Sequence, residues 1–321
     1  MNAPACPAPG SAADASSAPD AETTWVPPYP VSLGLLLAPF QRGTGDPTQR
    51  MLADGTAWRT ARTPLGPATL RLSVAPAAGE VRAQAWGPGA GWVVDRVPAL
   101  LGAGDDVSGF EPRHPVIAST WRRLPHLRLP SLGLVVEVLV PAILEQRVTG
   151  IEARRSWREL LRRFGEPAPG PTPVPMRVVP SAEVWRRIPS WEWHRAGVDP
   201  GRARAAIAAA GAAYRLEESL TLPRADRLRR LRAVPGIGVW TAAETAQRAW
   251  GDPDEPSVGD FHVPALVGWA LVGRPVDDAG MLELLAVYPG HRHRAARLVE
   301  LSGVGKPSFG PRSPVGDIRA I

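Results

Sequence analysis

The chain has 321 residues and is strongly basic, with a formal net charge of +6 and a pI of about 10.5. Its 44% hydrophobic and 21% charged residues are ordinary for a soluble globular protein, and its length allows two or three domains. The basic charge indicates a polyanion partner, for which nucleic acid is the first candidate. The single cysteine, Cys6, excludes an intramolecular disulfide and any four-cysteine metal site. Because no signal peptide and no long apolar run occurs, we expect a cytoplasmic protein with no membrane partner.

Both ends of the chain are poor in bulky apolar side chains. Residues 1–23 are mostly Ala, Pro, Ser and Asp, and residues 304–321 are rich in Gly and Pro. Segments of this composition cannot bury enough apolar surface to offset the entropy of ordering. We therefore predict a disordered N-terminal tail over 1–23 and a flexible C-terminal tail over 304–321.

Residues 24–112 have the pattern of a small β-domain. Short apolar runs and one alternating run are separated by turn clusters such as "RGTGDP" and "APAAGE". The runs assigned to this pattern are "VSLGLLLAPF" (31–40), "TLRLSV" (69–74), "EVRAQAW" (80–86) and "GWVVDRV" (91–97). They predict an antiparallel sheet, with a helix near Pro98–Leu101.

Residues 113–303 have a helical pattern. The run "GLVVEVLVPAILEQRVTG" from Gly133 is apolar nearly all round, which predicts a buried helix, with a kink or break at Pro141. An amphipathic helix follows and is expected to end at Gly165. Asp199, followed by a proline, predicts the capped start of a later helix.

The stretch "VPGIGVWTA", Val234–Ala242, lies between two segments with helical patterns. The first helix is expected to stop at Pro235 and the second to start near Val239. Gly236 and Gly238 allow backbone geometry that is closed to other residues. The first amides of the second helix have no intrahelical partners and lie at the positive end of its dipole, so they can bind a phosphate. The alternative is a plain turn between two helices.

Asp260 stands 24 residues after Gly236, before a further helix expected to begin near Phe261. This order of hairpin, helix, loop and "GD" resembles the helix-hairpin-helix DNA glycosylase superfamily. The hairpin of this chain, which contains Trp240, is most similar to that of the 3-methyladenine DNA glycosylase II branch of this superfamily. "TTWVPPYPVSLGLLLAPF" resembles the N-terminal sheet domain of that branch, and "LRLPSLGLVVEVLVPAILEQRVTG" resembles its central helix with an A-I-L-x-Q signature. The resemblance covers residues 25–303 and implies an α+β fold, in which a small antiparallel sheet domain precedes a mostly helical, two-lobed glycosylase region.

The resemblance implies a monofunctional DNA glycosylase of base excision repair. Such an enzyme flips alkylated bases, of the 3-methyladenine and 7-methylguanine type, out of double-stranded DNA and hydrolyses the N-glycosidic bond. Asp260 would stabilise the positive charge that develops on the sugar and would orient or deprotonate a water. The amides of Gly236 and Gly238 would bind DNA phosphates. Taken alone, Asp260 is equally well explained as a helix N-cap.

Trp240 stands where bifunctional members of the superfamily have a lysine that forms a Schiff base with the sugar. The only lysine of this chain is Lys306, so we expect no abasic-site lyase activity. The resemblance places Trp240, Glu244 and His291 in the base pocket, although Trp240 alone also fits a core role. The best-known members have a tyrosine at the position of Glu244 and a tryptophan at that of His291, so the range of lesions stays open.

Further assignments also come from the resemblance. No cofactor is required for the chemistry, but the family holds a monovalent cation, Na⁺ or K⁺, on hairpin carbonyls, here those of Arg232, Val234 and Ile237. Leu129 is the candidate for the apolar wedge that fills the gap left by a flipped base. We expect a monomer that associates with the nucleoid.

Two other functions remain open at this stage. One is a non-catalytic helix-hairpin-helix DNA-binding protein, and the other is a glycosylase for deaminated or oxidised bases. Asp260 favours an enzyme over a binding protein, because gripping phosphates does not require a carboxylate.

Overall fold

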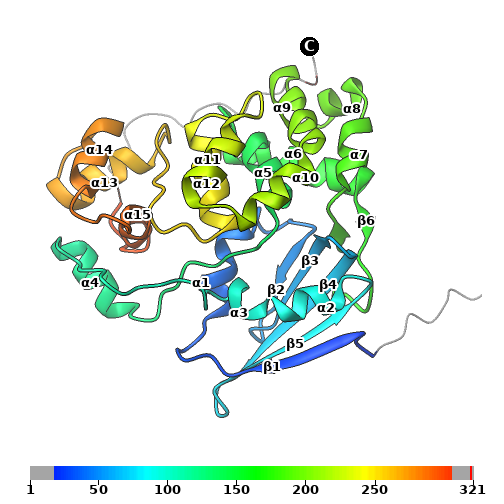
Figure 1. Cartoon of the computed structure of the whole chain (residues 1–321), viewed down its shortest axis with the longest axis horizontal. Coiled ribbons are helices and arrows are strands. Elements are labelled where there is room, and N and C mark those ends of the chain that lie inside the picture. The colour runs from blue at the N-terminus through cyan, green and yellow to red at the C-terminus, as the bar shows by residue number, and fades with distance from the viewer. Residues whose placement is uncertain (1–17, 306–318, 320–321) are drawn as a thin grey trace, which may run out of the picture.

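The computed structural model describes residues 18–305 and residue 319 (Figure 1). Within this part of the chain no helix has both the length and the apolar character needed to cross a bilayer. A five-stranded antiparallel sheet forms one side of the molecule, and helices make up most of the rest. This combination confirms the predicted α+β class.

The sheet has the strand order β1-β5-β4-β3-β2. The strands are β1 (Ala21–Trp25), β2 (Gln49–Met51), β3 (Ala57–Thr63), β4 (Gly66–Ala75) and β5 (Glu80–Trp86), and a separate two-stranded ribbon joins β6 (Glu166–Pro167) to β7 (Arg177–Val178). In β5, Val81, Ala83 and Ala85 are buried, whereas Arg82 and Gln84 alternate with them and point to the opposite face. The strands predicted from "TLRLSV" and "EVRAQAW" are therefore confirmed.

The N-terminal boundary of the sheet differs from the prediction. Residues 21–23, assigned to a disordered tail, belong to β1, where Thr23 pairs with Ala83 of β5. The run from Ala21 to Trp25 is rich in threonine and ends in an aromatic residue, and such residues suit a half-buried strand. Residues 1–17, together with most of the predicted C-terminal tail (306–318 and 320–321), lie outside the described residues.

Two apolar runs that we assigned to strands are helical instead. "VSLGLLLAPF" forms α1 (Leu33–Leu37) and a 3₁₀ turn (Ala38–Phe40), and "GWVVDRV" lies in α2 (Ala90–Asp95) and the start of α3 (Val97–Leu100). The buried residues of α1 are Leu33, Leu36 and Leu37, which is the i, i+3, i+4 spacing of a helix. The helix predicted near residue 98 is α3.

The remaining helices follow in chain order. They are α4 (Pro115–Arg123), α5 (Val135–Leu144), α6 (Gly150–Phe164), α7 (Ala182–Arg187), α8 (Ser190–Arg195), α9 (Pro200–Gly211), α10 (Ala213–Glu218), α11 (Arg224–Arg232), α12 (Val239–Ala249), α13 (Val263–Val272), α14 (Asp278–Leu285) and α15 (Arg292–Glu300), with a 3₁₀ turn at Ser219–Thr221. The predicted cap residues are confirmed. Gly165 is the C-cap of α6, and Asp199 accepts hydrogen bonds from the amides of Gly201 and Arg202 at the start of α9.

The central helix α5 is almost entirely buried and packs against α9 and α12. The break predicted as one outcome at Pro141 does not occur, because α5 continues to Leu144 and the Glu145 amide still donates to the Pro141 carbonyl, at 3.1 Å. At the other end, the two carboxylate oxygens of Glu217 accept the amides of Val135 and Val136, each at 2.9 Å. These bonds satisfy amides that have no partner within the helix.

The described residues form two main hydrophobic cores. The larger one joins the inner face of the sheet to α2, α5, α6, α9 and α12. The second core lies among α4, α13, α14 and α15, which gather on one side of the molecule in Figure 1. The loop that follows α12, residues 250–262, passes from the larger core to the second one and carries Asp260.

Candidate functional site

Helices α11 and α12 are joined by a six-residue turn, 233–238. Gly236 has a φ of +85°, and a Cβ at this position would lie 2.6 Å from the Cβ of Ala205 in α9. Glycine is therefore required there both by the backbone conformation and by the close approach of α9. Gly238 is exposed, has open space where a Cβ would stand, and is the N-cap of α12. Without a side chain there, the first amides of α12 are accessible to an anion.

Gln146, just after α5, connects this helix to the hairpin. Its Nε2 donates to the Gly236 carbonyl at 3.0 Å and to the Thr241 hydroxyl at 2.8 Å. The next residue, Arg147, is exposed and has a φ of 54°, the one positive φ among the non-glycine residues that the structure describes. Our sequence interpretation quoted Gln146 within a signature but assigned neither residue a role. The contact of Gln146 spans 90 residues of chain, so no local pattern indicates it.

Asp260 and Trp240 are in direct contact. The Trp240 Nε1–H donates to Asp260 Oδ2 at 3.0 Å, and Asp260 Oδ1 accepts the amides of His262 at 2.7 Å and Val263 at 2.9 Å. Both side chains are half-buried. Asp260 is not the N-cap residue of α13, which is His262. One of its oxygens nevertheless accepts the two amides at the start of this helix, while the other oxygen faces the indole. The helix begins at Val263, two residues later than expected.

Two arginines hold the loop that leads to Asp260. Arg224 of α11 binds Asp252, with Nε to Oδ2 at 2.7 Å, and also pairs with Glu255. Arg292 of α15 grips Asp254 through two parallel hydrogen bonds, of 2.8 and 2.7 Å, and donates its backbone amide as well. Burial opposes ionisation of Asp254, but the hydrogen bonds from Arg292 outweigh it and hold the pKa of this carboxyl below its usual value. The loop is thus fixed from both sides.

Glu244 is bound within the protein rather than available to a base. It is 8% exposed, its Oε2 lies 2.7 Å from Arg248 Nη1, and its Oε1 accepts the Ser257 hydroxyl at 2.6 Å. Arg248 neutralises the charge of Glu244, which does not favour attraction of a cationic base. Glu244 instead ties α12 to the loop before Asp260. A role of Glu244 in the base pocket stays a prediction.

His291 is partly buried and contacts the second core through Phe110. Its Nε2 lies 3.2 Å from the Ser108 carbonyl, its Nδ1 accepts from Arg294, and its ring meets the Phe110 ring edge-on with centroids 5.4 Å apart. These contacts attach the imidazole to α15 and to the segment before α4, not to the pair formed by Trp240 and Asp260. A role of His291 in a base pocket stays a prediction.

Leu129 does not suit the assignment of a DNA wedge. Its side chain is 4% exposed, and its amide donates to Asp105 Oδ2 at 2.8 Å. A wedge must project from the surface to enter a base step. The use of the Leu129 side chain in packing does not favour the assignment, which stays a prediction.

Of the residues assigned to a monovalent cation, Val234 and Ile237 lie on the turn between α11 and α12, and Arg232 is the last residue of α11. The Val234 carbonyl accepts the Ile237 amide at 3.1 Å, which leaves one lone pair of this oxygen for another ligand. Both side chains are buried, whereas Arg232 is exposed. The cation site itself stays a prediction.

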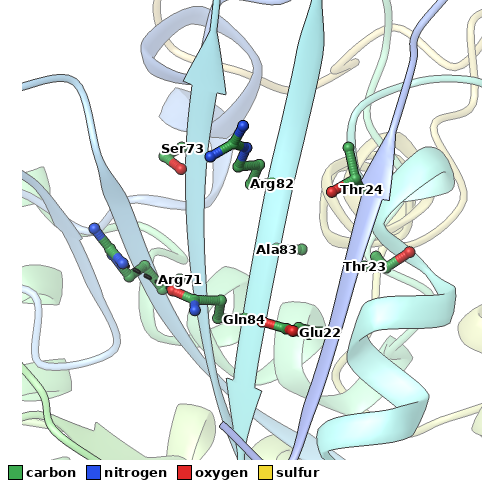
Figure 2. Close-up of a pocket in the computed structure, with 8 residues that line it drawn as sticks. All are labelled: Glu22, Thr23, Thr24, Arg71, Ser73, Arg82, Ala83 and Gln84. Carbon is green, nitrogen blue, oxygen red and sulfur yellow. Dashed lines mark hydrogen bonds between the residues drawn. The ribbon is translucent and has the colours of Figure 1, made fainter. Parts of the chain in front are cut away.

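A separate concavity of about 630 Å³ lies on the outer face of the sheet (Figure 2). It is lined by residues of β1, β4 and β5, all polar except Ala83, with Arg71 hydrogen-bonded to Gln84 at 2.8 Å. It contains no residue of the hairpin or of the loop that carries Asp260. We therefore place the candidate site at Trp240 and Asp260 and not in this concavity.

No protein-family model matches the chain, and no curated protein sequence matches it either. Solved structures do match. A 3-methyladenine DNA glycosylase from Archaeoglobus fulgidus aligns with a TM-score of 0.71 at 15% identity, over 87% of this chain and 98% of that one. The 8-oxoguanine glycosylase/lyase of Clostridium acetobutylicum aligns with a TM-score of 0.63 at 11% identity, over 81% of this chain and 90% of that one. The same enzyme in complex with double-stranded DNA aligns with a TM-score of 0.63. The chain therefore has the fold of these DNA glycosylases, as the resemblance in its sequence predicted.

Proposed function

We propose that the protein is a monofunctional DNA glycosylase that releases alkylated bases from double-stranded DNA. One observation carries the proposal: the Asp260 carboxylate is hydrogen-bonded to Trp240 on the helix that begins at the glycine hairpin. A protein that only grips phosphates has no use for a carboxylate held in this way. The fold, which it shares with DNA glycosylases, supports the proposal.

DNA binding starts from the sugar–phosphate backbone. The amides that follow Gly238 lie at the positive end of α12 and can donate hydrogen bonds to a phosphate, and Gly236 allows the turn to form beside α9. Nearby arginines add charge, and Arg232, Arg147 and Arg204 are exposed. Since phosphate contacts release counterions, DNA binding is expected to weaken steeply with salt.

The chemical step is cleavage of the bond between C1′ of a flipped nucleotide and its base. The bonding electrons leave with the base, so positive charge develops on C1′ and on the ring oxygen. Asp260 stabilises that charge and orients the attacking water or accepts its proton, and the water oxygen bonds to C1′. The Trp240 N–H fixes the direction of Oδ2 while Oδ1 is held at the start of α13. The products are a free base and an abasic site.

Alkylated purines are the substrate class that suits Trp240 best. A purine methylated at N3 or N7 carries positive charge, which makes it a good leaving group and attracts it to the face of an indole. The half-buried Trp240 lies directly against the carboxylate, so its ring is available near the reacting sugar. With the charge of Glu244 neutralised by Arg248, the selectivity for cationic bases rests on Trp240 and on Asp260 itself.

Release of free bases from methylated DNA tests this function. Free 3-methyladenine or 7-methylguanine should appear in the soluble fraction, with duplexes that contain uracil or 8-oxoguanine as the other arms. Release from only the uracil or the 8-oxoguanine duplex would show that the substrates are deaminated or oxidised bases and not alkylated ones. Release from none of them, with DNA binding kept, would favour the non-catalytic alternative.

The protein should not cut DNA at an abasic site. A lyase needs an amine that forms a Schiff base with the sugar, and Trp240 stands where bifunctional members of the superfamily that the sequence resembles have that lysine. Incubation with abasic duplex in the absence of alkali should leave the strand intact, and borohydride should trap no adduct. Treatment of the same product with hot alkali, which cleaves every abasic strand, is the control. A trapped covalent adduct would contradict this prediction.

The grip of Arg292 on Asp254 should matter for the rate of base release. The substitution Arg292→Met removes both side-chain hydrogen bonds to Asp254, so only backbone hydrogen bonds still attach the loop that carries Asp260 to α15. We expect a roughly tenfold lower single-turnover rate with little change in the Kd for DNA, because misplacement of a reacting group lowers the rate more than the binding. Arg297→Met on the same helix, which removes a pair with Glu300, is the matched control. Equal rates for the two variants would show that the grip does not position Asp260.

A further inference from the structure

Phe261 is the most exposed of the large hydrophobic side chains that the structure describes, at 84%. A single exposed apolar residue is normal on a protein surface and indicates nothing by itself. Phe261, however, follows directly on Asp260. Val239, which is 42% exposed, stands directly before Trp240. Exposed apolar side chains therefore flank both members of the hydrogen-bonded pair.

The backbone around Phe261 is held rigidly. The amides of the next two residues, His262 and Val263, donate to Asp260 Oδ1, and the Asp260 amide donates to the Ser257 carbonyl at 3.2 Å. One residue further back, the Gly259 amide donates to Asp278 at 2.8 Å. The Phe261 ring packs edge-on against the His262 ring, with centroids 4.9 Å apart. The ring thus projects from a preorganised turn, which lowers the entropy lost when it contacts a partner.

We propose that Phe261 stacks on the π face of an unpaired nucleobase when DNA is bound, an inference that rests on the proposed function. If Asp260 reaches C1′ of the flipped nucleotide, the next Cα lies only about 3.8 Å further along the chain. The ring of Phe261 is then within reach of the bases around that sugar. Every base has a π face, so stacking on an aromatic side chain tolerates any sequence. A contact beside a repair site needs this tolerance, because damaged bases occur in any sequence.

Flipping leaves two kinds of base whose π face is open to stacking on Phe261. One is the extruded base itself, and the other is the base left without a partner on the opposite strand. A phenyl ring recognises the same feature in both cases. The fluorescent base 2-aminopurine, placed at either position, distinguishes them, because stacking on an aromatic ring changes its emission.

The experiment compares Phe261→Ala with Tyr214→Ala. Tyr214 is an equally exposed aromatic residue, at 81%, and lies in α10, on the other side of α12 from α13 in Figure 1. Two duplexes are used, with 2-aminopurine either at the target position or opposite an abasic site. In Phe261→Ala we expect binding to the labelled duplex to weaken by about tenfold and the fluorescence change to be lost in one of the two duplexes. Phe261→Tyr, which keeps an aromatic ring, should restore both, and Tyr214→Ala should behave as the wild type.

The outcomes separate this inference from the proposed function. If the wild type releases methylated bases and Phe261→Ala matches it in binding and in both fluorescence signals, the inference is overturned and the function stands. If the wild type releases no base but its fluorescence change depends on Phe261, the stacking contact stands and the function fails. If the wild type does not bind DNA, both are overturned. Thermal unfolding of each variant confirms that the fold is kept, as expected for a side chain with so little buried area.

Discussion

The substitution Asp260→Asn should reduce base release by at least about a hundredfold while DNA binding is largely kept. Asparagine keeps the size of the side chain and an oxygen that can cap α13, so the amides of His262 and Val263 retain an acceptor. What the variant loses is the negative charge that stabilises the sugar cation and the basicity that acts on water. The measurement is the single-turnover rate of base release from methylated DNA, with the Kd for the same duplex determined in parallel.

A matched control is present in the next helix. Asp277 is the N-cap residue of α14 and accepts the Gly280 amide at 2.9 Å. Like Asp260 at α13, it binds a backbone amide in the first turn of a helix. Asp277→Asn should therefore leave base release close to that of the wild type. If Asp260→Asn and Asp277→Asn were equally active, Asp260 would be only a helix cap, and the assigned mechanism would be wrong.

The second large effect concerns stability, and it comes from Arg294 in α15. Its guanidinium is fully buried and binds Asp105 through two hydrogen bonds, of 3.0 and 2.5 Å, while Asp105 also accepts the Leu129 amide. Arg294→Met leaves the Asp105 carboxylate buried without its counter-charge. The free energy of unfolding should fall by about 3–5 kcal/mol, as measured by urea denaturation.

Two further variants check the cause of this loss. Arg297→Met on the same helix breaks a more exposed pair with Glu300 and should cost less than about 1 kcal/mol. The double variant Arg294→Met/Asp105→Leu, which leaves no unpaired charge, should recover part of the lost stability. An Arg294→Met protein as stable as Arg297→Met would show that the buried pair is not what joins α15 to the loop at Asp105.

Several local elements could be predicted because their signals are short-range. The alternation in "EVRAQAW" is that of β5, Gly165 ends α6, and Asp199 caps α9 as its position before a proline indicates. The assignments that went wrong involve short apolar runs. "GWVVDRV" and "VSLGLLLAPF" are too short to separate a strand from a buried helix by their period. For "GWVVDRV", only the packing of α2 against the sheet decides that a helix forms and not a strand.

In the candidate site, too, some features could be predicted from the sequence and others could not. The turn between α11 and α12 was predictable, since a proline and two glycines disfavour a continuous helix, although α11 ends at Arg232 and not at the expected Pro235. The pair of Glu244 with Arg248 has the i, i+4 spacing of a helix, which the sequence carries. The hydrogen bond from Ser257 to Glu244 and the burial of Leu129 were not predictable, because a list of residues does not tell which side chains are used in packing. Phe261 was named only as the expected start of a helix, and its exposure is visible only in the folded chain.

By itself, the sequence determined the basic charge, the positions of the glycine turn and of Asp260, and the absence of a lysine before Lys306. These are properties of residue identity and short-range geometry, which the chain carries before it folds. The tertiary structure alone decided that Trp240 donates to Asp260, 20 residues away, and that Arg294 meets Asp105, 189 residues away. Such contacts depend on how helices from two cores pack around a connecting loop, and no local preference encodes that packing.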